Sequence, residues 1–455
     1  MGDYVTRHPG TGTVLKVFPV ATAAEIEDVL EESSAAYRMW RVTSLRQRAE
    51  VLRRVAALYR ERSEELALTA TLEMGKPVTQ AKGEIVLTAD IYEYYADHGE
   101  RFLADEPLEI AGRGEALVRT EPIGPLVGIM PWNYPHYQVA RFAAPNILLG
   151  NTVVLKHARN CPQSALAIEA LMTDAGLPAG VYVNVFADST QIAQMIADSR
   201  VQGVSLTGSE RAGSAVGEVA ERHLKKYVLE LGGSDPFIVL DGHDLDATVA
   251  AAVNNRLTNA GQACTASKRF IVLDDIFDAF VGRFATAMRA QVPGDPVDPD
   301  TTFGPLSSRE AVDELAAQVD DAVAKGATVL TGGHRIAGAG SFYEATVLTD
   351  VTPAMRAYRE ELFGPVVHRA ASADAAVALA NDTPFGLAAA VYTLDIDQAR
   401  ALAERLEAGM VWINGTSKSA PDLPFGGVKA SGVGRELARY GIEEFANKKL
   451  VRVIG

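Results

Sequence analysis

Short apolar runs alternate with longer segments of helical periodicity through the middle of the chain. The apolar runs are rich in β-branched residues and cover residues 151–156, 181–185, 203–206 and 227–231. Segments in which apolar positions recur at helical spacing lie between them, at residues 162–175 and 190–197. This alternation is typical of a parallel sheet with crossover helices, so we expect an α/β fold.

A second series of such runs follows in the C-terminal half, at residues 236–240, 269–273, 389–393 and 410–414. The chain has 455 residues, which exceeds the size at which one hydrophobic core keeps growing. The two series therefore indicate two α/β domains. Before the first series, Ser44 and Gln47 form a capping box ahead of apolar positions at helical spacing, which predicts a helix there.

The pattern changes between residues 107 and 120, where two extended runs flank Gly112 and Gly114. This change predicts a β-hairpin inserted into the first domain. Residues 449–454 are also β-prone, and an exposed hairpin needs a partner strand. We therefore expect the C-terminal run to pair with the hairpin or with a neighbouring subunit.

Composition narrows the function classes. The net charge of −15 disfavours binding to nucleic acid and to anionic membrane surfaces. No apolar run is long enough to span a membrane, and we expect no metal site. The two cysteines, Cys161 and Cys264, are too few for a disulfide framework and fit a reducing compartment, so we expect a cytoplasmic protein.

An acidic residue, Glu230, lies in the apolar run 227–231, which leads directly into Gly232 and Gly233. Burial raises the pKa of a carboxyl group, and a carboxylate of raised pKa acts as a base near neutral pH. The alternative is a salt-bridged carboxylate at a strand end.

Two further residues suit covalent catalysis. Cys264 follows a glycine-containing turn, where backbone N–H groups and a helix start would favour a thiolate; the alternative is a cysteine packed in the core. Asn133 stands between Pro131 and Pro135, which pin a turn and fix its amide as a donor for an oxyanion. A structural Asx-turn is the alternative for Asn133.

Taken together, these segments identify a family resemblance. PWNYP, VVLKHA, SLTGSERAG, LELGG, GQAC, EELFGPV and PFGGVKASGVGRE occur in the order found in the aldehyde dehydrogenase superfamily, and Cys264 comes 34 positions after Glu230, as in that family. The resemblance runs from end to end. It implies a Rossmann-like coenzyme domain (1–104 and 123–232), an α/β catalytic domain (233–435) and an oligomerisation element (105–122 and 436–455) that builds a homodimer or homotetramer.

The resemblance also implies roles for the catalytic residues. Cys264 attacks the aldehyde carbon, and the Asn133 side chain and the Cys264 backbone N–H hold the resulting oxyanion. After hydride transfer, water activated by Glu230 hydrolyses the thioester to a carboxylic acid. Cys161 is expected to be structural, and Ala266, two residues after the nucleophile, leaves no partner for a disulfide switch at the site.

For the coenzyme, the family pattern implies contacts spread over several segments. The expected contact residues are Trp132, Lys156, Arg159, Gly208, Ser209, Leu231, Glu361 and Phe363. Many NAD⁺-preferring members carry a glutamate where this chain has Arg159, so the repulsion of a 2′-phosphate is absent and a charge-assisted contact becomes available. NADP⁺ is therefore favoured over NAD⁺. The alternatives are an Arg159 turned to solvent and, for the Glu361 segment, a simple turn before a strand.

The substrate contacts resemble those of succinate-semialdehyde dehydrogenases of the shorter bacterial branch. Arg141 and Ser419 match residues that bind the substrate carboxylate in that group, unless Arg141 forms a surface salt bridge. A further arginine that some members have six residues before the nucleophile is Thr258 here, with Arg256 two residues earlier as in the shorter branch.

We therefore expect oxidation of succinate semialdehyde to succinate with NADP⁺ or NAD⁺. Another short or ω-carboxylated aldehyde, such as glutarate semialdehyde, is the main alternative. A coenzyme-A-acylating enzyme is disfavoured because Glu230 is present. A catalytically silent structural relative is the remote alternative.

Overall fold

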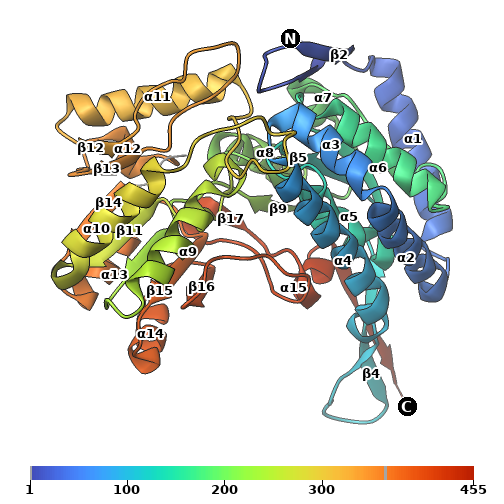
Figure 1. Ribbon diagram of the computed structural model, residues 1–455. Coiled ribbons are helices and arrows are strands. Elements are labelled where there is room, and N and C mark those ends of the chain that lie inside the picture. Colours follow the sequence, from blue (N-terminus) through green and yellow to red (C-terminus); the bar gives the residue numbers. More distant parts are fainter. Residues whose placement is uncertain (1–2, 363–365, 455) are drawn as a thin grey trace.

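The computed structural model describes residues 3–362 and 366–454. Two α/β lobes lie side by side, each built on its own sheet, and a long hairpin projects from the body (Figure 1). Both predicted series of strands are present, with boundaries within a few residues of those expected. The expected α/β class is confirmed.

The first lobe contains a six-stranded sheet in the order β17-β9-β8-β5-β6-β7, parallel except for β17. Its strands are β5 (Pro125–Met130), β6 (Thr152–His157), β7 (Tyr182–Asn184), β8 (Gly203–Thr207), β9 (Lys226–Glu230) and β17 (Gly432–Val433). Helices α5 (Tyr137–Leu149), α6 (Pro162–Asp174), α7 (Ser189–Ala197) and α8 (Glu210–Arg222) connect the parallel strands. β17 belongs to this sheet although it comes from the stretch that the sequence assigns to the catalytic domain.

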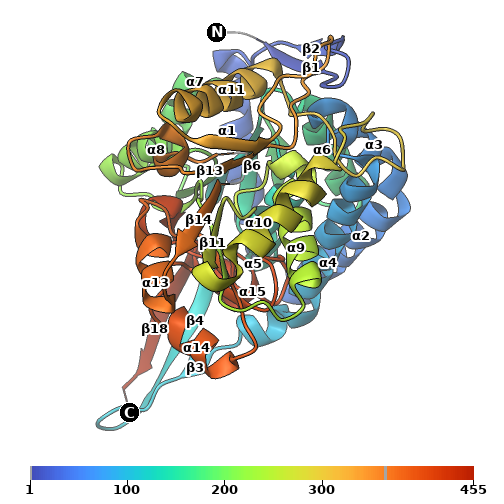
Figure 2. The ribbon, with the colours of Figure 1, turned by 60° about the vertical axis from the view of Figure 1, so that its left-hand side comes forward.

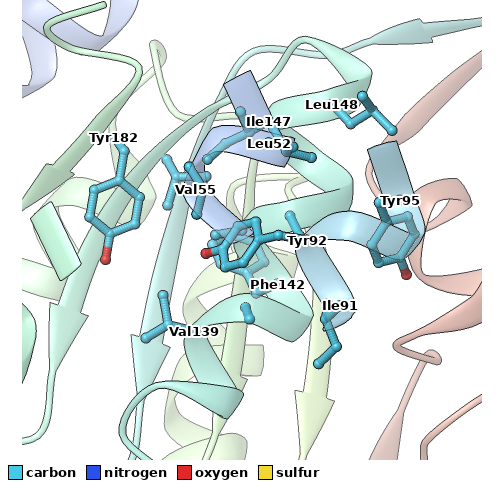
Figure 3. Close-up of a cluster of buried hydrophobic side chains, with 14 of the residues drawn as sticks. Leu52, Val55, Ile91, Tyr92, Tyr95, Val139, Phe142, Ile147, Leu148 and Tyr182 are labelled. Atoms are coloured by element: carbon cyan, nitrogen blue, oxygen red, sulfur yellow. The ribbon is translucent and has the colours of Figure 1, made fainter. Parts of the chain in front are cut away.

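Alternate side chains of these strands face two different cores, because successive residues of a strand point to opposite sides of a sheet. Leu126 and Val153 join a large core with α5 and α6, whereas Val127 and Val154 join a smaller core with α7 and α8. Figure 3 shows part of the large core, where Val139 and Phe142 lie among side chains from other helices.

The N-terminal segment covers this sheet. It comprises β1 (Tyr4–Arg7), β2 (Val14–Phe18), α1 (Ala23–Trp40), α2 (Leu45–Glu61), α3 (Ser63–Met74) and α4 (Val78–Phe102). The predicted capping box starts α2: the Ser44 side chain accepts from the Gln47 N–H, and the Gln47 side chain accepts from the Ser44 N–H. Leu52 and Val55 of this helix are fully buried in the large core (Figure 3).

The second lobe contains a seven-stranded sheet in the order β12-β13-β14-β11-β10-β15-β16, in which only the β12–β13 pair is antiparallel among the described strands. Its strands are β10 (Pro236–Val239), β11 (Arg269–Leu273), β12 (Thr328–Thr331), β13 (Val347–Thr349), β14 (Val366–Ala370), β15 (Ala388–Tyr392) and β16 (Met410–Ile413). The helices of this part are α9 (Leu245–Leu257), η1 (Thr258–Gly261), α10 (Asp274–Arg289), α11 (Arg309–Ala324), α12 (Arg356–Arg359), α13 (Ala373–Asn381) and α14 (Ile396–Ala403). Two short helices, η2 (Lys429–Ser431) and α15 (Ala438–Glu443), follow as the chain returns to the first lobe.

The hairpin strands β3 (Glu106–Pro107) and β4 (Glu115–Pro122) form a three-stranded antiparallel sheet with β18 (Ala446–Val453). All eight residues of β18 pair with β4, so the expected pairing of the C-terminal run with the hairpin is confirmed within one chain. This sheet extends away from both lobes in two views (Figures 1 and 2). Across the described ranges, we find no helix with the length and apolarity needed to cross a membrane.

Candidate active site between the two lobes

Glu230 is the last residue of β9, the strand that leads from the first sheet towards the second lobe, and it is 2% exposed. Gly426 approaches the Glu230 carboxylate closely. A Cβ atom at Gly426 would lie only 2.8 Å from Glu230 Oε1 and 2.9 Å from the Gly434 carbonyl oxygen, which favours a glycine at this position. Among the described residues, no donor reaches either carboxylate oxygen. Burial raises the pKa of Glu230 well above its usual value, and the nearby Glu436 carboxylate raises it further. The salt-bridged alternative for Glu230 therefore does not apply.

Asn133 lies in the bend before α5, and its side chain reaches the loop that carries Cys264. Its Nδ2 donates to the Gln262 carbonyl at 2.9 Å, and its own backbone carbonyl accepts from Asn259 Nδ2 at 2.9 Å. These two bonds join the Asn133 turn to the cysteine loop. The amide is thus fixed by a tertiary contact to Gln262, two residues before Cys264.

The loop before Cys264 has an uncommon backbone. Asn259, Ala260 and Gly261 have φ values of 54°, 55° and 78°, a left-handed turn that non-glycine residues rarely adopt. Arg256 stabilises this turn through hydrogen bonds: its buried guanidinium donates to the carbonyls of Gly261 and Ser267. Arg256 thus binds the backbone of the loop, and it is not among the side chains that line the cavity described below.

In the structure, burial opposes the expected ionisation of Cys264. Burial raises the pKa of the Cys264 thiol to about 12, although Arg141 and Lys268 lower it. Cys264 lies in a turn after η1, and no described helix begins at it. The desolvation of a thiolate therefore outweighs the donors of the turn. The second cysteine, Cys161, is fully buried and free, in line with its expected structural role.

A cavity of about 620 Å³ opens in front of Cys264. Its walls come from α4, α5, the cysteine loop and the segment around Ser419, and both predicted substrate residues, Arg141 and Ser419, line it. Tyr137 joins them: its hydroxyl donates to Ser419 Oγ at 2.7 Å and accepts from Arg141 Nη1 at 3.3 Å. Tyr137 was not singled out from the sequence, although its position four residues before Arg141 on one helix was a usable signal.

Arg141 is not a surface residue. It is 1% exposed, and its Nε lies 2.7 Å from Oε2 of the buried Glu436. Its guanidinium also stacks over the Phe425 ring, with 4.2 Å between its central carbon and the ring centroid. The predicted alternative of a surface salt bridge is therefore wrong, and the partner Glu436 was not singled out from the sequence.

A second cavity, of about 550 Å³, lies at the carboxyl ends of β5, β6 and β8. Lys156 and Arg159 line it together with apolar residues of α7 and α8. Burial and the nearby Arg159 cation together lower the pKa of Lys156 to about 8. The two cations beside an apolar chamber fit a nucleotide with an additional phosphate group.

Ser209 is the N-cap of α8: its Oγ accepts from the Ala212 N–H at 3.4 Å. A Cβ at the preceding Gly208 would meet only one side-chain atom, at 3.6 Å, so the backbone there is open to a close approach. Free N–H groups at a helix start suit a pyrophosphate, so this end of α8 fits the predicted role.

Two of the remaining predicted coenzyme contacts, Leu231 and Glu361, lie near the residues that follow Glu230. Leu231 packs against α8, where a Cβ at Gly213 would lie 2.5 Å from it. Glu361 Oε1 accepts from the Gly233 N–H at 3.2 Å, so its carboxylate lies over the glycines that follow Glu230. The carbonyl of Trp132 accepts a long contact from Cys161 Sγ at 3.9 Å. Phe363 lies outside the described residues.

Comparisons with known proteins support the resemblance to the aldehyde dehydrogenase family. The model of the "Aldehyde dehydrogenase family" matches residues 2–451. A succinate-semialdehyde dehydrogenase [NADP(+)] of Deinococcus radiodurans is 56% identical over 451 residues, which cover 99% of this chain and 94% of that protein. The succinate semialdehyde dehydrogenase [NAD(P)+] Sad of Escherichia coli (strain K12) is 47% identical, with 98% and 97% covered.

Among solved structures, the succinic semialdehyde dehydrogenase from Streptococcus pyogenes in complex with NADP⁺ has a TM-score of 0.97 and 41% identity, and the match covers 99% of this chain and 100% of that one. The family resemblance and the fold predicted from the sequence are confirmed. The chain belongs to the aldehyde dehydrogenase family.

Proposed function

We propose that this enzyme oxidises succinate semialdehyde to succinate with NADP⁺ as the hydride acceptor. The observation that carries the proposal is the polar group Arg141, Tyr137 and Ser419 in the same cavity as Cys264. A buried cation with two hydroxyl groups beside it suits a substrate carboxylate, which the net charge of −15 would otherwise repel. The relatives named above carry the same activity in their names.

Residues of this chain can then be assigned to the steps of aldehyde oxidation. The Cys264 thiol first loses its proton to solvent, and the thiolate sulfur forms a bond to the aldehyde carbon while the carbonyl oxygen becomes an oxyanion held by Asn133 and the Cys264 N–H. A bound coenzyme would supply the acceptor for the hydride that leaves this carbon. Glu230 then takes a proton from water, whose oxygen attacks the thioester carbon and releases the acid and the Cys264 thiolate.

For the coenzyme, Lys156 and Arg159 would hold the adenosine ribose and its 2′-phosphate, Gly208 and Ser209 the pyrophosphate, and Glu361 the nicotinamide ribose. Trp132, Leu231 and Phe363 would complete the site. The cavity that Lys156 and Arg159 line supports this assignment, as does the NADP(+) in the names of the relatives.

The test compares succinate semialdehyde with butanal, its uncharged four-carbon counterpart, with NADP⁺ and with NAD⁺. For the wild type, we expect kcat/KM to favour the carboxylated aldehyde, and Arg141→Met to remove most of that preference while butanal turnover changes less. Ser419→Ala should cause a smaller loss. Equal turnover of both aldehydes in the wild type would contradict the substrate assignment, and a higher kcat/KM with glutarate semialdehyde would favour the longer substrate.

We also propose a cytoplasmic homodimer or homotetramer assembled through the β3–β4–β18 sheet. β18 is an edge strand with exposed Leu450 and Val453, and an exposed apolar edge is a ready template for pairing with another chain. The two free cysteines fit a reducing compartment. Light scattering of the full chain and of Leu450→Lys tests the assembly, and a wild-type mass equal to one chain would contradict it.

We propose in addition that the coenzyme domain (1–104 and 123–232), the catalytic domain (233–435) and the oligomerisation element (105–122 and 436–455) are the units of this chain. The separate sheets of the two lobes support the division. β17 is the exception, because it belongs to the proposed catalytic domain by sequence and pairs with β9 of the first sheet. Limited proteolysis tests it: first cleavage between the sheets supports the division, and first cleavage within one sheet contradicts it.

A further inference from the structure

Lys268 is a buried cation directly behind the nucleophile. Its side chain is 1% exposed, and it precedes β11. Its Nζ donates to the Cys264 carbonyl at 2.5 Å and to the Ala263 carbonyl at 3.2 Å. An ammonium group held in this way fixes the backbone on which the Cys264 side chain stands.

The same ammonium group faces the predicted coenzyme contact Glu361. Lys268 Nζ lies 3.4 Å from Glu361 Oε1, the oxygen that also accepts from the Gly233 N–H. The second oxygen, Oε2, lies 2.8 Å from where a Cβ at Gly232 would be. One carboxylate therefore connects Lys268 to the two glycines that follow Glu230.

We propose that Lys268 is a positioning residue that couples the Glu361 carboxylate of the coenzyme site to the backbone of the nucleophile Cys264. The inference rests on the proposed function for the roles of Glu361 and Cys264. Its physical content is that a single buried charge orients the thiol, favours its ionised form and is itself held in place by Glu361.

Other groups act on the same thiol, and a test must separate them from Lys268. The ionisable side chains that interact with Cys264 are Arg141, Tyr134 and Tyr137 from α5 and the bend before it, Asp235 from the turn before β10, Glu361, and Lys268 itself. Arg141 and Lys268 are the two cations of this set. Loss of Lys268 therefore leaves Arg141 as the cation that still favours the thiolate.

The experiment measures the alkylation rate of Cys264 by iodoacetamide between pH 6 and 10, resolved from Cys161 by peptide mass spectrometry. No aldehyde or coenzyme is added, so the result does not depend on the proposed reaction. We expect Lys268→Gln to slow alkylation about tenfold, the change that corresponds to one pKa unit of the thiol. Lys268→Arg, which keeps the charge, should restore most of the rate.

The direction of the change separates positioning from mere support of the loop. A loosened loop exposes the thiol and speeds alkylation, so an unchanged or faster rate in Lys268→Gln would overturn the proposal. Arg256→Gln is the matched control, because it also removes a buried cation that binds carbonyls of this loop but does not contact the Cys264 carbonyl. We expect its effect on the alkylation rate to be under threefold or to be an acceleration; slowing equal to that of Lys268→Gln would overturn the specific role of Lys268.

The coupling to Glu361 is tested by a double-mutant cycle on the same rate. The effect of Glu361→Gln in the wild type and its effect in the Lys268→Gln protein should differ by about threefold or more. Equal effects would show that Glu361 acts on Cys264 independently of Lys268, and the proposed coupling would be wrong. Failure of the proposed function would appear elsewhere, as aldehyde oxidation that survives Cys264→Ala.

Discussion

Arg141 and Glu436 form a buried ion pair, with 2.7 Å between Arg141 Nε and Glu436 Oε2, at the wall of the cavity that contains Cys264. Both side chains also act on Glu230: after burial, Glu436 contributes most to raising its pKa, and Arg141 opposes this effect. The cation expected to bind the substrate carboxylate and the expected general base are therefore linked through one carboxylate.

This link gives a prediction for the pH dependence of turnover. Glu230 works as a base only when it is deprotonated, so its raised pKa moves the rise of kcat to higher pH. Glu436→Gln removes the neighbouring negative charge and leaves Arg141 without its counterion, and both changes lower the pKa of Glu230. We expect the pH of half-maximal kcat to fall by about one unit.

The measurement is kcat from pH 5 to 10 with saturating succinate semialdehyde and NADP⁺. Glu444→Gln is the matched control, because Glu444 is a weaker contributor to the same pKa, and it should cause a smaller shift in the same direction. A profile that moves to higher pH in Glu436→Gln would contradict the electrostatic account.

The buried Glu230 should also reduce stability at alkaline pH. Its pKa in the folded protein lies above the unfolded value, so its contribution is favourable at pH below the unfolded value and is lost as the pH rises. Glu230→Gln carries no such charge. We expect its melting temperature to exceed that of the wild type at pH 8, with a difference that shrinks towards pH 5; a difference that grows on acidification would contradict this.

The same variant tests the expected division of labour at the site. If Glu230 activates the water that cleaves the thioester, Glu230→Gln should still form NADPH in a single rapid burst and then stop. Stopped-flow absorbance of NADPH at equimolar enzyme resolves the burst. A normal steady-state rate would remove Glu230 from the role of base.

Coenzyme preference should depend on Arg159. Replacement by glutamate introduces a repulsive charge beside the cavity that Lys156 also lines, and we expect kcat/KM with NADP⁺ to fall about tenfold or more while that with NAD⁺ changes little. Arg159→Gln, which removes the charge without repulsion, should give a smaller loss. Equal losses with both coenzymes would contradict a contact to the 2′-phosphate.

A second buried ion pair holds the start of α5. Glu84 Oε2 pairs with Lys76, and its Oε1 accepts from the N–H groups of His136 at 2.8 Å and Tyr137 at 3.1 Å. Both side chains of the pair are at most 1% exposed. Glu84→Leu leaves a buried ammonium unpaired and should lower the free energy of unfolding by about 3–5 kcal/mol.

Urea unfolding at fixed protein concentration measures this loss. The double variant Lys76→Met/Glu84→Leu should recover part of the stability, because no charge is then left unpaired. The recovery should be incomplete, since the two backbone N–H groups still lose their acceptor. A double variant less stable than Glu84→Leu would contradict the ion-pair account.

Much of the fold was predictable because each strand carries its own local signal. The runs before Lys156 and Glu230 are apolar and β-branched, which suits a strand buried on both faces of a parallel sheet. The capping box at Ser44 and the pairing of the C-terminal run with the hairpin were predictable for the same reason. The capping box depends only on neighbouring residues, and the strand pairing depends on the exposed edge of the hairpin.

The structure brings several of the predicted site residues together. Asn133 reaches the Cys264 loop, and Arg141 and Ser419 line one cavity with Cys264. The pKa of Cys264 could not be predicted from the sequence, because burial is a property of the packed interior and opposes the nearby cations.

The amino-acid sequence by itself determined the order of the elements, the family and the identity of the reactive side chains, because local periodicity and short motifs carry this information. Only the tertiary structure decided which charges meet. Glu436 lies beside Arg141 and Glu230, and Lys268 connects Glu361 to Cys264, across segments far apart in the chain. Such contacts arise where two lobes close on one cavity, and the low dielectric there makes each buried charge depend on its neighbours.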